Sequence, residues 1–360
     1  MSNRTRPLES LPAQREAINL ACCGMMFRIH TDNSAAAAWL LEFVQPWFTS
    51  GTGSATHVIS LQSSRDLYDD ARGRQPSGAT HRACYAFDQM AFTLPSWTED
   101  EATVFHDAER SCVLRIDGTC VTLLADPSSR RWRMHLLWML CEIVATEWRR
   151  SQVDLHAAAV EFGGQGIALC GPKMSGKSTL LLNLLLSGRF RFVSNDRVFI
   201  DGHQVRGIPT AVKLRPDTLT RFPNLVRGLP AVSRPYLHNS RELGEWPDGL
   251  VDREVAEFFA LSTAQFAKQL GAEAAASAPL KVLLFPRLDP EVDSWRLEGL
   301  TIDECAAALR ANPYGNPPPR NDDQAGTIAR AVAGFRLTLG PNAYDDPDFA
   351  VRLMNAMERG

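Results

Sequence analysis

Residues 166–186 read GIALCGPKMSGKSTLLLNLLL, and this stretch decides the fold. Its first five residues are small or apolar and predict a buried strand over Gly166–Cys170. The leucine-rich run Ser178–Leu186 predicts a helix, and Gly188 stands where a helix ends in a left-handed glycine. A strand, a glycine-containing turn and a helix in this order are typical of an α/β fold.

The turn itself, Gly171–Ser178, matches the pattern G-x-x-x-x-G-K-[ST] in full, and we call it the phosphate loop. In such a loop the main-chain N–H groups point inward around an anion, and the helix N-terminus adds positive charge. Lys177 is expected to reach the β- and γ-phosphate oxygens of ATP, and Ser178 to ligate Mg²⁺. The alternative is a simple glycine turn with a chance Lys-Ser pair. The residues expected to bind the nucleotide are Gly171, Pro172, Lys173, Met174, Ser175, Gly176, Lys177, Ser178 and Thr179.

Two residues near the loop in sequence are candidates for the chemistry. Asp196 follows the predicted strand Phe190–Val193, which we expect to lie parallel to the loop strand and to end at the same crevice. There its carboxylate could hold Mg²⁺ or accept a proton from a substrate hydroxyl, although aspartate also favours plain turns. His156 lies in the predicted strand Leu155–Phe162, where it is either a site residue or a satisfied core histidine.

The length and composition suit two domains, or one domain with a large extension. The chain has 360 residues, of which 45% are hydrophobic and 22% charged. A long amphipathic helix over Arg130–Arg150 predicts a boundary just before it. We therefore expect a mixed α/β domain over residues 1–129 and a catalytic domain over residues 130–360.

The charge and the apolar segments also restrict the partners. A net charge of −3 disfavours nucleic acid. Met1–Glu16 lacks the apolar region of a signal peptide, and Met134–Trp148 is too short and too polar to span a membrane. The eight cysteines include no C-x-x-C pair, so reduced thiols in a cytoplasmic protein are expected.

The first third predicts several short strands. We expect one strand over Leu20–Ile29, a helix over Ala35–Phe43 capped by Asp32 or Ser34, and an exposed loop over Arg65–His81. Asp117-Gly118 predicts a hairpin turn.

Three segments together resemble the catalytic core of HPr kinase/phosphorylase, and more closely the HPr-kinase-related proteins. They are Leu155–Val160 (LHAAAV), the phosphate loop and Ser194–Val198 (SNDRV), within a similarity over roughly Leu137–Leu300. The resemblance implies a P-loop core like that of phosphoenolpyruvate carboxykinase, with an additional N-terminal α/β domain. It also implies ATP and Mg²⁺ as cofactors, with Asp196 as a base and metal ligand and His156 beside the transferring phosphate. The weaker implied contacts to phosphate or substrate are Arg206, Lys213 and Arg215.

The sequence departs from that family at Asn195, where the acidic turn often carries a second carboxylate. This puts a reverse, phosphorylase reaction in doubt and disfavours HPr as the substrate. Related proteins with an extra N-terminal domain include kinases of lasso-peptide precursors. The resemblance therefore predicts a serine kinase acting on a peptide or protein, with residues 1–129 available for peptide recognition and a homo-oligomer as one option. A small-molecule kinase and a non-catalytic ATP-binding regulatory protein are the alternatives.

Overall fold

The chain forms two compact units, each described by itself. Unit 1 takes in residues 16–41, 48–84 and 93–134, and unit 2 takes in residues 42–47 and those from 135 onward. This is a computed structural model, and the residues that it describes are 16–84, 93–129, 131–214, 222, 237–238, 258–314 and 322–359.

Unit 1 is built on one mixed sheet, so its α/β character is as predicted. The strands lie in the order β3-β1-β2-β4-β9-β8-β7-β6-β5. The pairs β2–β4 and β4–β9 are parallel, and the other neighbours are antiparallel. The strands are β1 Glu16–Cys22, β2 Met25–Thr31, β3 Thr49–Ser50, β4 His57–Ser63, β5 Thr80–Ala83, β6 Thr93–Glu99, β7 Ala102–Asp107, β8 Cys112–Asp117 and β9 Cys120–Ala125.

Two hairpins of unit 1 test the turns predicted from the sequence: one turn was missed and the other was predicted. The predicted single strand over Leu20–Ile29 is wrong, because the chain reverses at Cys23-Gly24 between β1 and β2. Both turn residues have positive φ, +48° and +83°, as a two-residue hairpin turn requires. The hairpin predicted at Asp117-Gly118 is confirmed: β8 and β9 pair up to Asp117 and Cys120.

The helices of unit 1 correct two further predictions. Helix α1 covers Ser34–Val44, and its cap is Asn33 rather than Asp32 or Ser34, since Asn33 Oδ1 accepts a hydrogen bond from the Ala36 N–H at 2.9 Å. The loop expected over Arg65–His81 instead begins with helix α2, Arg65–Gly73. Tyr68 and Ala71 are its buried residues, too few to give a periodic signal in the sequence.

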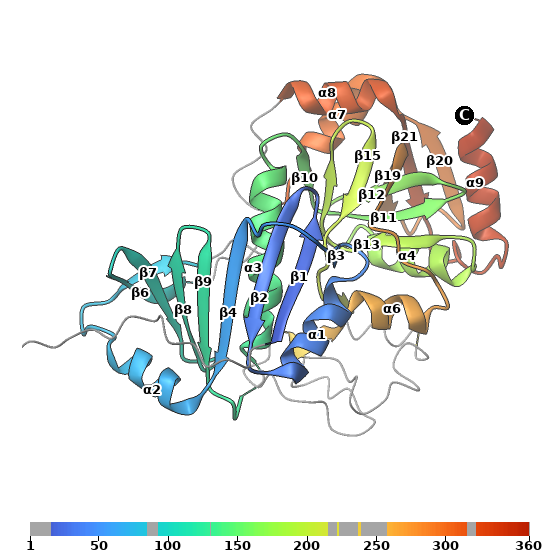
Figure 1. Ribbon diagram of the computed structural model, residues 1–360. Coiled ribbons are helices and arrows are strands. Elements are labelled where there is room, and N and C mark those ends of the chain that lie inside the picture. The colour runs from blue at the N-terminus through green and yellow to red at the C-terminus, as the bar shows by residue number, and fades with distance from the viewer. Residues whose placement is uncertain are drawn as a thin grey trace, which may run out of the picture. The chain divides into compact units, whose positions relative to one another are not determined.

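Unit 2 has a larger mixed sheet in the order β10-β14-β15-β19-β12-β11-β13, with β21 beside β19 and β20 beside β21 (Figure 1). A second, small sheet has the order β16-β18-β17. The strands are β10 Val153–Leu155, β11 Ala157–Phe162, β12 Gln165–Cys170, β13 Arg191–Ser194, β14 Val198–Ile200, β15 Gln204–Gly207, β16 Val212–Leu214, β17 Leu237–His238, β18 Phe258–Leu261, β19 Ser277–Leu288, β20 Trp295–Gly299 and β21 Ala333–Leu339.

The helices of unit 2 are α3 Arg133–Trp148, which begins in unit 1, α4 Lys177–Leu186, α6 Thr263–Gln269, α7 Ile302–Arg310, α8 Asp322–Ala331 and α9 Phe349–Arg359. Helix α4 contacts β11 and β12, α7 and α8 contact β21, and α9 contacts β20. None of the described helices has the length and apolar run that crossing a membrane requires.

The strand directions in unit 2 bring three chain segments to one edge of the sheet. Strands β12 and β13 are both antiparallel to β11, so both end where β11 begins. The strand before Asp196 therefore runs parallel to the loop strand and ends at the same edge, as predicted, but β11 lies between the two strands. The predicted strand Leu155–Phe162 is also interrupted: β10 ends at Leu155, β11 begins at Ala157, and His156 sits in the break.

The core of unit 2 explains why this edge is well fixed. Small side chains on β11 and β12, among them Ala157, Ala159, Ala168 and Cys170, are fully buried. They belong to the same apolar cluster as residues of β19, α7 and α8, such as Leu283, Cys305 and Ile328. Strand β19 runs parallel to β12, so its C-terminal end also lies at the edge where β12 ends. Strands β11, β12, β13 and β19 thus support the candidate site.

Candidate active site

The phosphate loop connects β12 to α4 through a tight backbone path. Gly176 has φ of +94° and is the N-cap of α4, while Met174 takes the left-handed conformation with φ of +70°. A Cβ added at Gly171 would lie 2.8 Å from Ser175 Oγ, and one at Gly176 would lie 3.1 Å from Leu288 Cδ2. Both glycines therefore occupy positions where a side chain is disfavoured by space, and at Gly176 by the backbone as well.

Lys177 is folded into the loop. Its Nζ donates hydrogen bonds to the carbonyl oxygens of Gly171 at 2.6 Å and Pro172 at 2.8 Å. Burial lowers the pKa of Lys177 to about 8, although the nearby Asp196 carboxylate and the Cys170 sulfur act to raise it. Among the described residues the hydrogen bonds from this buried ammonium go to two neutral carbonyls, and a phosphate oxygen would be a better partner.

Two hydroxyl groups of the loop fit a phosphate and a magnesium ion. Ser175 is buried, and among the described residues its Oγ has no hydrogen-bond partner. Such a group is normally satisfied, so its orphan state fits a ligand oxygen at this place. Ser178, on the first turn of α4, is exposed and so can reach a metal ion. The described residues contain no cluster of three metal-ligating side chains. Mg²⁺ needs no such cluster, since it is commonly held by phosphates, water and one or two side-chain oxygens.

Asp196 and His156 meet at the sheet edge. His156 Nδ1 lies 3.3 Å from Asp196 Oδ1, and both side chains are partly exposed. The main chain fixes both residues: the Ala157 N–H donates to the Asp196 carbonyl at 3.2 Å, and the His156 N–H donates to the Asn312 carbonyl at 3.2 Å. The carboxylate is thus near solvent, beside a histidine and close enough to Lys177 to affect its pKa.

The other residues of the acidic turn, which we define as Ser194–Arg197, face the interior. Asn195 is buried, and its Oδ1 accepts a hydrogen bond from the Thr210 hydroxyl at 3.3 Å. The Ser194 hydroxyl donates to the Arg197 carbonyl at 2.7 Å, which closes the turn. Asn195 therefore acts as a buried hydrogen-bonding residue that links the turn to the loop around Thr210.

The residues with weaker sequence support are placed elsewhere. Arg206 forms an ion pair with Asp201 at 3.0 Å, and its strand pairs with β19 at Ser277, the opposite end of β19 from the phosphate loop. Lys213 lies in β16 of the small sheet, and Arg215 lies outside the described residues. The structure therefore does not bring Arg206 to the phosphate loop.

Sequence reasoning missed other residues that shape the site. Asn312 and Tyr314 lie beside His156, the first through its main chain and the second through a ring 6.4 Å from the imidazole between centroids. Leu288 approaches Gly176. These residues are more than 100 positions from their partners along the chain, and no local pattern marks them.

Comparison with known proteins gives little beyond a distant relation. No family model matches the chain, and a search of curated proteins finds no match. Among solved structures the chain is similar to the Hpr(Ser) kinase/phosphatase from Coxiella burnetii, with 14% identity. That match covers 57% of this chain and 99% of the other, with a TM-score of 0.24. A likeness of this size carries no weight for the activity, so the function below is argued from the phosphate loop and its neighbours.

Proposed function

We propose that this chain is a Mg-ATP-dependent phosphotransferase, and more specifically a serine kinase that acts on a peptide or protein. The observation that carries the proposal is the phosphate loop: a full G-x-x-x-x-G-K-S sequence between a buried strand and a helix, with Lys177 folded against it. Strand, loop and helix in this order make an anion site from main-chain N–H groups and a helix N-terminus.

The residues present fit Mg-ATP. The loop N–H groups, Lys177 and the unpartnered Ser175 hydroxyl would hold the phosphates, with Lys177 leaving its carbonyl partners for the β- and γ-oxygens. Ser178 would ligate Mg²⁺, with Asp196 as a second oxygen ligand. When bound, ATP would supply the phosphoryl group, and Mg²⁺ would neutralise the negative charge that develops on the phosphate oxygens.

Asp196 is assigned the proton transfer. As the acceptor hydroxyl oxygen bonds to the γ-phosphorus, the bond from that phosphorus to the bridging oxygen breaks and ADP leaves. The hydroxyl proton passes to the Asp196 carboxylate, which is partly exposed and therefore accessible to a substrate. His156, with Nδ1 3.3 Å from the carboxylate oxygen, would orient the carboxylate.

The acceptor is assigned from the resemblance described above. Unit 1 is a separate compact α/β unit, and the phosphate loop and acidic turn both belong to unit 2. Residues 1–129 are then available to recognise a peptide or protein that carries the serine. Asn195 in place of a carboxylate leaves one acid in the turn, which suits a forward kinase reaction.

The test is transfer of labelled γ-phosphate from ATP to candidate peptides, read as a mass gain of about 80 Da, one phosphoryl group. Asp196→Asn should lower kcat by about 10²–10⁴-fold while calorimetry still detects Mg-ATP binding. Lys177→Ala should lose both binding and transfer.

Each outcome separates the alternatives. Full transfer by Asp196→Asn would remove the base assignment. Transfer to a metabolite pool without a peptide would favour a small-molecule kinase. Mg-ATP binding without loss of phosphate to any acceptor or water would favour a non-catalytic regulatory protein.

A further inference from the structure

Four charged side chains meet in unit 2 next to the acidic turn, two of them buried (Arg197 and Asp154), one partly buried (Glu142) and one exposed (Arg149). We call them the charge cluster: Glu142 on α3, Arg149 just after α3, Asp154 on β10 and Arg197 at the end of the acidic turn. The cluster contains two guanidinium groups and two carboxylates, so its formal charges cancel. None of the four is assigned a role in phosphate binding or proton transfer above.

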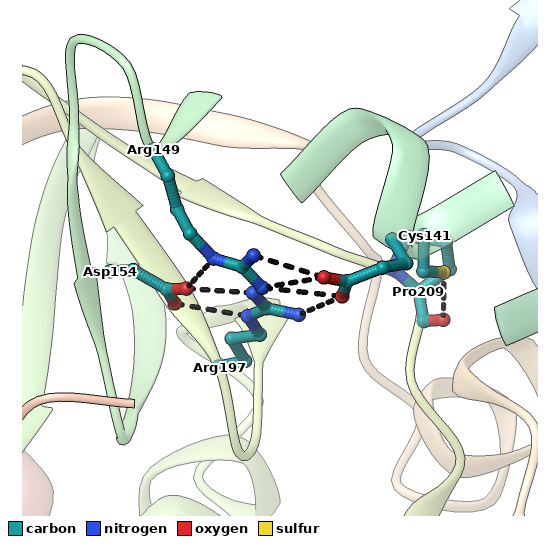
Figure 2. Close-up of polar contacts among 6 residues, drawn as sticks. Cys141, Arg149, Asp154, Arg197 and Pro209 are labelled. Atoms are coloured by element: carbon teal, nitrogen blue, oxygen red, sulfur yellow. Dashed lines mark hydrogen bonds and ion pairs between the residues drawn. The ribbon is translucent and has the colours of Figure 1, made fainter. Parts of the chain in front are cut away.

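Within the cluster each guanidinium group contacts carboxylates, so the charges of neighbouring side chains alternate. Arg197 donates from Nε to Asp154 Oδ1 at 2.9 Å and from Nη2 to Asp154 Oδ2 at 2.6 Å, a two-point contact (Figure 2). Arg149 Nε donates to the same carboxylate at 3.0 Å, and its Nη1 and Nη2 both donate to Glu142 Oε1 at 2.9 Å. The fourth side is closed by Arg197 Nη1 and Glu142 Oε2, 3.6 Å apart.

Arg197 is the most buried member, with an exposed fraction of 0% for its side chain. Its guanidinium carbon lies 4.3 Å from the Tyr314 ring centroid and 5.0 Å from that of Phe199. Burial alone would lower the pKa of Arg197, but the Asp154 carboxylate outweighs it and raises the pKa above the ordinary value. The guanidinium therefore stays charged and is held from several sides.

The charge cluster is connected to both candidate catalytic residues through the main chain. Arg197 directly follows Asp196, and Asp154 precedes His156 by two residues. The Tyr314 N–H donates to the Asp154 carbonyl at 3.0 Å, and the His156 N–H donates to the Asn312 carbonyl at 3.2 Å. One two-point contact between Arg197 and Asp154 thus ties the segment that carries Asp196 to the segment that carries His156.

Stability alone does not explain the buried Arg197–Asp154 pair at the centre of the cluster. Removing buried charges from water costs several kcal/mol per ion, and well-packed apolar residues of similar volume are often as stable or more so. What a two-point guanidinium–carboxylate contact adds is a defined geometry. We propose that the charge cluster is a positioning device, with Arg197 and Asp154 as positioning residues that set the Asp196–His156 contact.

The contact can be measured without any enzyme activity, so the test does not depend on the proposed function. The ring nitrogens and protons of His156 are observed by NMR in histidine-labelled protein, and His156→Gln assigns the signals. Asp196→Asn supplies the reference spectrum of a His156 without its carboxylate partner. Asp154→Asn keeps the shape of the side chain, removes its charge, and is expected to move the His156 signals toward that reference.

Kinetics give the second readout. If the proposed kinase reaction holds, Asp154→Asn should lower kcat about tenfold to hundredfold, because a displacement of about 1 Å can have that effect. The Kd for Mg-ATP should change less than about threefold, because the hydrogen bonds and ion pairs described for the cluster include none to the phosphate loop. A merely structural role would not separate kcat from nucleotide affinity in this way.

The matched control is Glu161→Gln. Glu161 is buried to nearly the same degree as Asp154, with 9% and 8% of the side chain exposed, and it pairs with Arg191 at 2.9 Å. It lies near the end of β11 away from His156, so its loss should lower stability and leave the His156 signals unchanged. If Asp154→Asn does not yield folded protein, Glu142→Gln removes the more distant carboxylate and should give a smaller shift in the same direction.

The proposal is overturned if His156 keeps its wild-type signals in a folded Asp154→Asn or Glu142→Gln variant. It is also overturned if Glu161→Gln shifts those signals equally, since the effect would then be a general loss of stability. Wild-type protein that transfers phosphate to no acceptor would remove the proposed function but would leave the NMR comparison intact.

Discussion

The phosphate loop and the acidic turn reach the same edge of the sheet in unit 2 by different means. In the loop, the groups suited to a ligand come from eight consecutive residues, Gly171–Ser178, and most belong to the main chain. In the turn, Asp196 depends on partners far away in sequence. His156 contacts its carboxylate, Thr210 holds Asn195 and Asp154 holds Arg197.

This difference predicts which changes affect binding and which affect transfer. A loop of main-chain donors is damaged by changes that alter backbone conformation, and the loss falls on nucleotide affinity. A carboxylate held by long-range contacts is damaged by changes in its partners, and the loss falls on kcat. Substitutions in the two regions therefore give opposite patterns, and the following tests are ordered by the size of the expected effect.

Among these tests, the largest effect is expected at Gly176. Its φ of +94° is unfavourable for any other residue, and an added Cβ would lie 3.1 Å from Leu288 Cδ2. Gly176→Ala should shift the loop and weaken Mg-ATP binding by about tenfold to hundredfold, given a strain of about 1–3 kcal/mol. Isothermal calorimetry measures the change.

The matched control for the loop is Gly299→Ala, at the end of β20. An added Cβ there meets no atom within 4 Å, and Gly299 does not have positive φ. It should bind Mg-ATP like the wild type. Equal affinities in all three proteins would mean that the loop conformation does not set nucleotide binding.

A smaller effect, on transfer alone, is expected at His156. His156→Gln removes the imidazole 3.3 Å from the Asp196 carboxylate. We expect kcat to fall about tenfold while the Kd for Mg-ATP stays the same, since a misplaced general base loses part of its contribution. His203→Gln is the control: it changes an exposed histidine in the turn between β14 and β15. A His156→Gln variant that loses affinity but keeps kcat would reverse the distinction drawn between the two regions.

The same distinction explains how much could be predicted from the sequence. The phosphate loop with its strand and helix was predictable, because its function depends on neighbours in the chain. The break at His156 was not, because it follows from β10 pairing with β14 while β11 pairs with β12 and β13. The role of Arg197 was hidden as well, since its partner Asp154 lies 43 residues away.

Local rules failed in unit 1 where weak signals competed. Asn33, Asp32 and Ser34 are all good capping residues, and only the chain path decides that Asn33 caps α1. Helix α2 was mistaken for a loop because the polar residues that mark its surface resemble those of a loop. Its formation is supported instead by local pairs such as Arg65–Asp69, 2.8 Å apart at i,i+4.

The phosphate loop should also show an effect of pH on nucleotide binding. Burial lowers the pKa of Lys177 to about 8, whereas a bound triphosphate favours the charged ammonium. Above pH 8 the Lys177 ammonium of the nucleotide-free protein loses its proton. Binding of Mg-ATP must then take up a proton, so the Kd for Mg-ATP should rise by up to about tenfold per pH unit. Calorimetry at pH 7, 8 and 9 measures this.

Arginine supplies the control for that titration, because Lys177→Arg stays charged over the whole range and its affinity should not fall with pH. The stability of the nucleotide-free protein changes with pH in the opposite direction to nucleotide affinity. The pKa is lower in the folded protein, so the unfolded chain binds more protons between about pH 8 and 10.5, and the nucleotide-free protein gains stability as pH rises through that window. A wild-type Kd that is constant from pH 7 to 9 would contradict the buried position of the ammonium.

The smallest expected effect is at Met174, where the loop holds a side chain in the left-handed region with φ of +70°. This conformation costs a residue other than glycine about 1–2 kcal/mol, and glycine loses about 0.5–1 kcal/mol through its greater freedom when unfolded. Because 62% of Met174 is exposed, little packing is lost, and Met174→Gly should raise the free energy of unfolding by about 0.5–1 kcal/mol. Denaturant unfolding without nucleotide measures the gain.

Met174→Ala is the control. It removes the same side chain but keeps the backbone strain, so it should not stabilise the protein. Equal stability of the two variants would show that the loop relaxes around Met174 and that its backbone is less rigid than the Lys177 contacts to Gly171 and Pro172 imply.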